Sequence, residues 1–173
     1  MQWRAFPLHP ETPEEGTTLE ELFAGRGVDL EKSKLRLKQV ADELALPLAD
    51  REKTYNSRLA QELAKWAESK GKGDAFHDAV FRAYFVEGKN VGKVDELVTL
   101  AKSIGLPEEK ARSVLESRAF KEAVDSDWSR SHALGITAVP TFVANQHSVV
   151  GAQPYEVLEK LMKASGVKRK SSG

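Results

Sequence analysis

Residues 135–143 read GITAVPTFV, and this segment constrains the fold more than any other part of the chain. Pro140 has no backbone N–H, so it cannot donate to a sheet and belongs at the first residue of a strand. The run Thr141-Phe142-Val143 that follows is typical of a strand. A Val-Pro bond at such a tight strand start accepts a cis peptide at low cost, and the sequence leaves its isomer open.

The sequence after Pro140 predicts a β-hairpin and a final helix. We expect strands at residues 141–143 and 148–151, joined by a turn at residues 144–147. Pro154 then opens a helix whose apolar face carries Val157, Leu158, Leu161 and Met162.

Helical periodicity dominates the chain before the hairpin. A short helix is expected at residues 19–24 and a longer one at 34–46, and residues 56–134 read as one helix after another. The aromatic stripe around Phe81 is interpreted as core rather than as a ligand site. Residues 2–8 alternate large apolar with polar or small residues, so they predict a strand that runs into a loop.

Composition excludes several classes of function. Lys+Arg and Asp+Glu both number 26 in the 173 residues, so no overall field favours nucleic acid or an anionic membrane. The one local basic excess, Lys168-Arg169-Lys170, is interpreted as a solvated terminus. No apolar run approaches the ~20 residues of a membrane span, and no secretion signal is visible at Met1. We therefore expect a soluble, cytoplasmic protein.

The side chains that usually carry catalysis are absent or scattered. The chain has no cysteine, which excludes disulfides, thiolate metal sites and a cysteine nucleophile within it. The histidines show no metal-ligand spacing, no serine lies in a nucleophile elbow, and no glycine-rich loop fits a phosphate; the histidines are His9, His77, His132 and His147. We predict no catalytic residue, no metal and no cofactor in this chain.

The segment before the hairpin has two interpretations. In one, Val139-Pro140 only shapes the start of a strand. In the other, the backbone of Val139 stays free of internal pairing and accepts an extended peptide as an added strand, because Pro140 interrupts the ladder there. The candidate substrate-binding residues are then Thr137, Ala138, Val139 and Pro140.

Several motifs together resemble a known family. Residues 138–143, 150–154 and the last helix are similar to the end of the DsbA-like thioredoxin family. Residues 3–8, 15–16, 55–60 and 81–85 resemble its FrnE-like subgroup, whose relatives include 2-hydroxychromene-2-carboxylate isomerases and kappa-class glutathione transferases. The resemblance covers nearly the whole chain. It implies an α/β, thioredoxin-like sheet of DsbA type with a large all-helical insertion.

The resemblance also implies what this sequence lacks. The family carries a first strand and a Cys-x-x-Cys helix before the strand that residues 2–6 resemble, so we expect a sheet that is incomplete at its N-terminus. Relatives with serine in place of cysteine carry it in the same segment. The predicted thioredoxin-like domain comprises residues 1–54 and 135–173, and residues 55–134 form the helical insertion domain.

Three functions remain open at this point. The family activity is thiol–disulfide oxidoreduction of protein or small thiol substrates, and this chain is expected to be inactive in it because it has no cysteine. An alternative is a non-enzymatic peptide-binding or assembly module that uses the open sheet edge near Val139-Pro140. The third is a truncated product of an active disulfide oxidoreductase. Unpaired sheet edges also predict self-association into a homo-oligomer.

Overall fold

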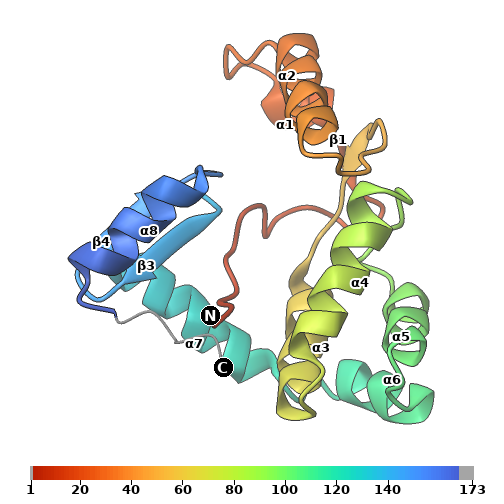
Figure 1. Cartoon of the computed structure of the whole chain (residues 1–173). Helices are drawn as coiled ribbons and strands as arrows, with labels where there is room; N and C mark the ends of the chain where they lie inside the picture. Colours follow the sequence, from red (N-terminus) through yellow and green to blue (C-terminus); the bar gives the residue numbers. More distant parts are fainter. Residues whose placement is uncertain (1, 168–173) are drawn as a thin grey trace. The chain divides into compact units, whose positions relative to one another are not determined.

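The computed structural model describes residues 2–167, so the basic tail Lys168-Arg169-Lys170 lies outside the described residues. Within that range the chain is rich in helix and contains two small antiparallel sheets (Figure 1). In chain order the elements are β1 (Thr17–Thr18), α1 (Leu19–Phe23), α2 (Leu30–Glu43), β2 (Lys53–Thr54), α3 (Arg58–Ser69), α4 (Gly73–Phe85), α5 (Val94–Ser103), α6 (Glu108–Glu116), α7 (Lys121–Ala133), β3 (Thr141–Ala144), β4 (His147–Val150) and α8 (Tyr155–Ala164).

The chain divides into two compact units. The first, which we call the helical lobe, runs from His9 to Ser126. The second, the hairpin unit, combines the segment up to Leu8 with the segment from Asp127 onward. This division reflects compactness alone, and the predicted domain boundaries after residues 54 and 134 stay a prediction.

The core of the helical lobe forms where the sequence periodicity predicts it. Leu63 and Ala67 of α3 are fully buried, and Trp66 is 6% exposed. They belong to one apolar cluster with residues of α4, α5 and α6, among them Phe76, Leu97 and Leu115. Gly105, with φ of +80°, follows α5, where a left-handed residue costs glycine little. The predicted α3–α6 succession is confirmed.

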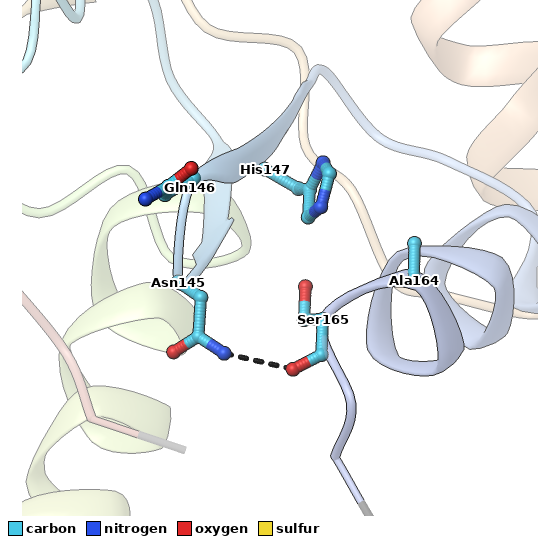
Figure 2. A pocket seen from close by; sticks show the side chains of 5 residues that line it. All are labelled: Asn145, Gln146, His147, Ala164 and Ser165. Carbon is cyan, nitrogen blue, oxygen red and sulfur yellow. Dashed lines mark hydrogen bonds between the residues drawn. The ribbon is translucent and has the colours of Figure 1, made fainter.

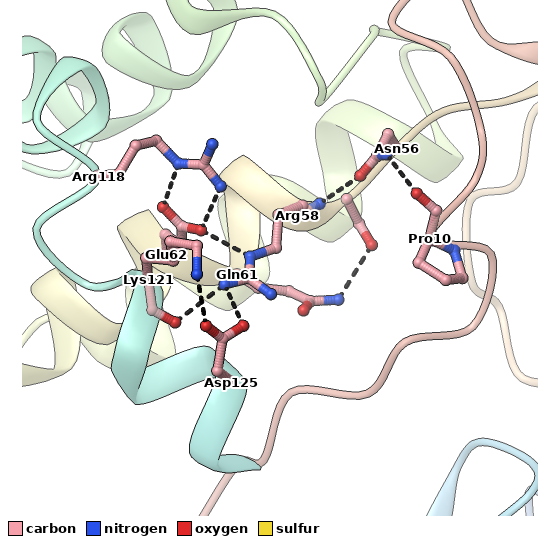
Figure 3. Close-up of polar contacts among 9 residues, drawn as sticks. Pro10, Asn56, Arg58, Gln61, Glu62, Arg118, Lys121 and Asp125 are labelled. Carbon is pink, nitrogen blue, oxygen red and sulfur yellow. Dashed lines mark hydrogen bonds and ion pairs between the residues drawn. The ribbon is translucent and has the colours of Figure 1, made fainter. Parts of the chain in front are cut away.

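A buried carboxylate ties three segments of the lobe together. Glu62 of α3 is 1% exposed and accepts hydrogen bonds from Arg58 Nε at 2.6 Å and from Arg118 Nε and Nη2 at 2.8 and 2.7 Å (Figure 3). Arg58 Nη2 also reaches Asp125 Oδ1 at 2.7 Å. Burial raises the pKa of Glu62, and the hydrogen bonds from Arg118 and Arg58 lower it. The hydrogen bonds and charges outweigh burial, so the pKa of Glu62 lies below its usual value. Glu62 is thus a charged, paired group inside the lobe.

Two asparagines hold the loop between residues 9 and 16. The Asn56 side chain donates to the carbonyls of Pro10 and Thr12 at 3.0 and 2.9 Å, and Asn90 donates to Glu14 O at 2.8 Å. Gly16 has φ of +80°, and a Cβ there would lie 2.6 Å from Thr54 O. These contacts fix the approach to β1, which pairs with β2.

The predicted strand at residues 2–8 is wrong. No described residue in that range belongs to a strand. Its backbone is held by a side chain instead: Ala5 N–H donates to Asp127 Oδ2 at 3.0 Å, and Arg4 Nη1 pairs with Asp127 Oδ1 at 2.8 Å. An alternating pattern becomes a strand only when a second strand offers a ladder, and no described strand pairs with this segment.

Two details of the helical predictions also need correction. The helix expected at 34–46 begins at Leu30, because the Asp29 side chain caps it by accepting from Lys32 N–H at 3.0 Å. Its apolar stripe is largely exposed, with Leu37 at 52% and Leu44 at 63%. In the aromatic stripe, Phe76 is core but Phe81 is 45% exposed, since its side of α4 is only partly covered.

The hairpin unit is built around β3 and β4. The two strands pair antiparallel with Thr141 opposite Val150 and Ala144 opposite His147. The second strand therefore begins one residue earlier than predicted. Helix α8 packs on the hairpin, and Leu161 is its buried residue (Figure 1). The mixed α/β fold class predicted from the sequence is confirmed.

Candidate functional site

The candidate site begins where α7 ends. Gly135 adopts φ of +66°, its N–H donates to His132 O at 2.9 Å, and Ile136 N–H donates to Ser131 O at 3.0 Å. This arrangement closes the helix with a left-handed glycine and satisfies its last carbonyls. The chain is thereby turned into residues 137–140, the predicted binding segment.

The segment around Pro140 is anchored on both sides. Pro140 O accepts a 2.7 Å hydrogen bond from Gly151 N–H, directly after β4. Thr141 Oγ1 donates to Ala138 O at 2.6 Å. The Val139–Pro140 peptide bond is cis. Carbonyl groups on either side of Val139 are therefore occupied within the hairpin unit.

Val139 itself stays open. Its N–H and C=O make no hydrogen bond to any described residue, and its side chain is 44% exposed. Thr137 and Pro140 are exposed and Ala138 is half-buried. The four predicted residues lie in one short loop, in which the backbone N–H and C=O of Val139 have no partner among the described residues.

The strand after the loop has an unpaired edge as well. Among the described residues β3 pairs only with β4, so its other edge carries backbone groups without a strand partner. Val143 of β3 is 45% exposed, and Val150 of β4 is 54% exposed. The loop precedes β3 directly in the chain, so unpaired backbone groups occur both at Val139 and along the free edge of β3.

Sequence reasoning missed the two residues that anchor the loop. Thr141 holds Ala138 through its hydroxyl, and Gly151 holds Pro140 through its N–H. Gly151 has φ of +88°, which a side chain would strain. A threonine directly after the proline and a glycine directly after the second strand were the available signals.

A polar depression of about 520 Å³ lies at the other end of the hairpin (Figure 2). Its residues serve structure: Asn145 Nδ2 donates to Ser165 O at 2.7 Å, and Ser165 Oγ donates to Ala144 O at 2.8 Å. These bonds tie the hairpin turn to the end of α8. The four residues of β3 separate it from Pro140 by roughly 13 Å, so it does not extend the loop.

Several titratable groups of the helical lobe have defined surroundings. In the described range, no three histidine or acidic side chains gather in a metal-binding arrangement. His77 lies on α4 with its Nε2 3.5 Å from Glu68 Oε1. Burial and the nearby charge of Arg26 lower the pKa of His9, which favours its neutral form.

No helix of the described residues is long and apolar enough to cross a membrane.

The fold and the loop are those of a thioredoxin-type protein. A match of the sequence to a family model identifies the family within this class. Residues 1–163 match the DSBA-like thioredoxin domain family, and the chain belongs to that family.

Among solved structures, a probable DsbA oxidoreductase from Streptomyces coelicolor is 29% identical. It has a TM-score of 0.82 and is matched over 98% of this chain and 77% of its own.

Two more distant structures show the same fold. A 2-hydroxychromene-2-carboxylate isomerase is 22% identical, with a TM-score of 0.68, over 87% of this chain and 70% of its own. A putative protein disulfide isomerase from Nitrosomonas europaea is 20% identical, with a TM-score of 0.62. The match covers 79% of this chain and 74% of that protein.

One curated protein is also similar. The uncharacterized protein YwbO of Bacillus subtilis is 34% identical over 103 residues, which are 59% of this chain. The match spans about half of that protein's length, 52%.

Proposed function

We propose that this chain provides the substrate-presenting part of a DsbA-type thiol–disulfide oxidoreductase. In this role an extended protein or peptide thiol or disulfide substrate lies along the loop, where the N–H and C=O of Val139 bind its backbone. The observation that supports this role is that both groups of Val139 lack an internal partner while the groups around them are anchored. The FrnE-like assignment within the family belongs to the same proposal.

The chain by itself carries out no disulfide exchange. Exchange begins when a thiolate attacks a disulfide sulfur, and no cysteine occurs in the sequence. Thr137, Ala138 and Pro140 then act as shape-determining residues beside the Val139 clamp, not as reacting groups. We expect no turnover above buffer in an insulin-reduction assay, and turnover by protein free of contaminating oxidoreductases would refute this.

Binding is tested at one position with two variants. A fluorescein-labelled heptapeptide with a central S-methylated cysteine is titrated and followed by anisotropy. Val139→Ala keeps both backbone groups and should bind within about 3-fold of the parent, whereas Val139→Pro lacks the N–H and should bind about 10-fold more weakly. Equal binding by both variants, with unchanged melting temperatures, would exclude the backbone clamp.

A second candidate is a non-enzymatic assembly module. The unpaired edge of β3 favours it, because a second copy of the chain satisfies such an edge by adding a strand. Self-association should then appear in light scattering as a mass that rises across micromolar concentrations. A constant monomer mass would count against homo-oligomer formation through this edge and leave the peptide role standing.

The third candidate is a truncated product of an active oxidoreductase. The DNA sequence upstream of the codon for Met1 distinguishes it from the other two. Translation upstream of Met1 that reveals an in-frame Cys-x-x-Cys about 30–40 residues earlier would favour it, given ordinary strand-plus-helix lengths. A cytoplasmic location is likewise part of the proposal, and fractionation of the native cell tests it.

A further inference from the structure

The helical lobe contains a cleft that the loop chemistry does not use. It has a volume of about 380 Å³ and lies between the C-terminal end of α3, the Leu106–Pro107 segment and α6. All its lining residues belong to the lobe: Trp66, Lys70, Leu106, Pro107, Lys110, Ser113 and Val114. Its size is at the lower end of the range for small-molecule sites.

The floor of the cleft is apolar and aromatic. Trp66 and Leu106 are 6% and 7% exposed, and both belong to the lobe's core cluster. Val114 packs against the same cluster and is half-buried. Because these groups are held by the core, the floor is preformed, and the small part of each side chain that stays exposed is apolar or aromatic.

The charge at the rim has one sign. Lys70 and Lys110 are exposed, and neither makes an ion pair with a described residue. No carboxylate lines the cleft, and Glu108 at the start of α6 pairs with Lys102 instead. The two ammonium groups therefore favour an anion over a neutral or cationic ligand.

Two uncharged donors complete the arrangement. The indole N–H of Trp66 donates to no described residue, although buried tryptophans usually find an acceptor. Its nitrogen is not among the fully buried polar atoms without a partner, so it keeps some contact with solvent. The Ser113 hydroxyl likewise makes no hydrogen bond within the described chain. These donors suit a carboxylate, which accepts up to about four hydrogen bonds.

We propose that this cleft binds a small aromatic carboxylate. Its ring lies on the Trp66 floor between Leu106 and Val114, and its carboxylate lies between Lys70 and Lys110. The cleft does not involve Val139 or Pro140, so this proposal goes beyond the thiol–disulfide role and is independent of it.

The experiment uses 2-naphthoate as probe and the indole N–H signals as readout. The chain has three tryptophans, and the Trp66 signal in a ¹H–¹⁵N spectrum is assigned with the Trp66→Phe variant. We expect 2-naphthoate to shift the Trp66 signal in a saturable way, with a Kd in the millimolar range or below. The uncharged analogue 2-naphthalenemethanol should bind more weakly.

Charge is tested with matched double variants. Lys70→Gln with Lys110→Gln should weaken 2-naphthoate binding about 3- to 10-fold, the effect of two exposed ion pairs. Lys38→Gln with Lys160→Gln removes the same charge from exposed positions outside the lining and should leave the affinity unchanged. A Trp66 signal that does not move, equal affinity for both analogues, or equal weakening by both double variants would each overturn the proposal.

Discussion

The helical lobe and the hairpin unit bury their apolar side chains to very different degrees. Many residues in the lobe form one continuous buried cluster, whereas Leu161 is the buried apolar residue of the described hairpin unit. Leu134, Val139, Val143 and Val150 of the hairpin unit are all more than 40% exposed. The lobe is thus stabilised by its own core, whereas the hairpin unit leaves most of its large apolar side chains partly exposed.

The two units also differ in how completely their polar groups are paired. In the lobe a buried carboxylate is paired twice by arginine, and the Asn56 and Asn90 side chains hold the loop at residues 9–16. In the hairpin unit the backbone of Val139 and one edge of β3 stay open. Such open groups are what the proposed peptide-binding role uses, because an added strand can pair with them.

The largest expected effect is in the lobe core. Phe76→Ala should lower the free energy of unfolding by about 3–5 kcal/mol, because it leaves a cavity at a fully buried position. Phe81→Ala on the same helix is the matched control, since Phe81 is 45% exposed. Its cost should be about 1 kcal/mol. Guanidinium titration followed by circular dichroism measures both, and equal costs would break the contrast between core and surface on α4.

The next effect concerns the buried carboxylate. Glu62→Gln should destabilise the lobe by about 2–3 kcal/mol, because Arg118 and Arg58 then lose their charged partner. Gln61→Ala, next to it on α3, should cost about 1 kcal/mol or less. Urea unfolding of the two variants makes the comparison, and similar midpoints would show that the network contributes little.

The same carboxylate predicts an acid response. The pKa of Glu62 is lower in the folded chain than in the unfolded chain, so its contribution to stability is complete above the unfolded value. That contribution is lost as the pH falls through the lower, folded pKa. Parent stability should therefore decline more steeply than that of Glu62→Gln when the pH falls below the ordinary glutamate pKa. Parallel curves of unfolding free energy against pH would contradict this assignment.

A smaller effect is expected where Asp127 holds the N-terminal segment. Asp127→Asn weakens the contacts to Arg4 and to Ala5 N–H, at about 1 kcal/mol. Hydrogen exchange at Ala5 should accelerate about 5-fold. Gln2→Ala removes only an exposed contact to Arg4, so it should change the hydrogen-exchange rate at Ala5 little. Unchanged exchange at Ala5 in the Asp127 variant would mean that other contacts hold residues 2–8.

The smallest effect is expected on the hairpin surface. Val143→Thr and Val150→Thr keep β-branched side chains at exposed positions, so each should change the unfolding free energy by about 0.5 kcal/mol or less. Differential scanning calorimetry measures this. A loss as large as that of Phe76→Ala would show that these valines are buried in solution, for example by a second copy of the chain.

Local pattern was sufficient for much of the fold. The apolar periodicity of α3 through α6 and the hairpin after Pro140 follow from short windows of sequence, and both are present. The four residues of the candidate site also lie in one window, so the sequence could group them. What they bind stays a prediction, because a loop's free backbone groups do not name a ligand.

Other features depend on residues far apart in the chain. Glu62 meets Arg118 across 56 positions, and Asp127 meets Arg4 across 123. No local window contains such pairs, so the network and the anchoring of residues 2–8 could not be predicted. The cleft at Trp66 has the same origin, since α3 and α6 line it together.

By itself, the sequence determined the helix periods, the interruption of the ladder at Pro140 and the absence of a thiol, because each depends on residue type and near neighbours. The tertiary structure decided that residues 2–8 form no strand, that the carboxylate of Glu62 is charged inside the lobe, and that Val139 keeps its backbone open. Pairing and burial are set by which distant segments meet, and that is a property of the folded chain.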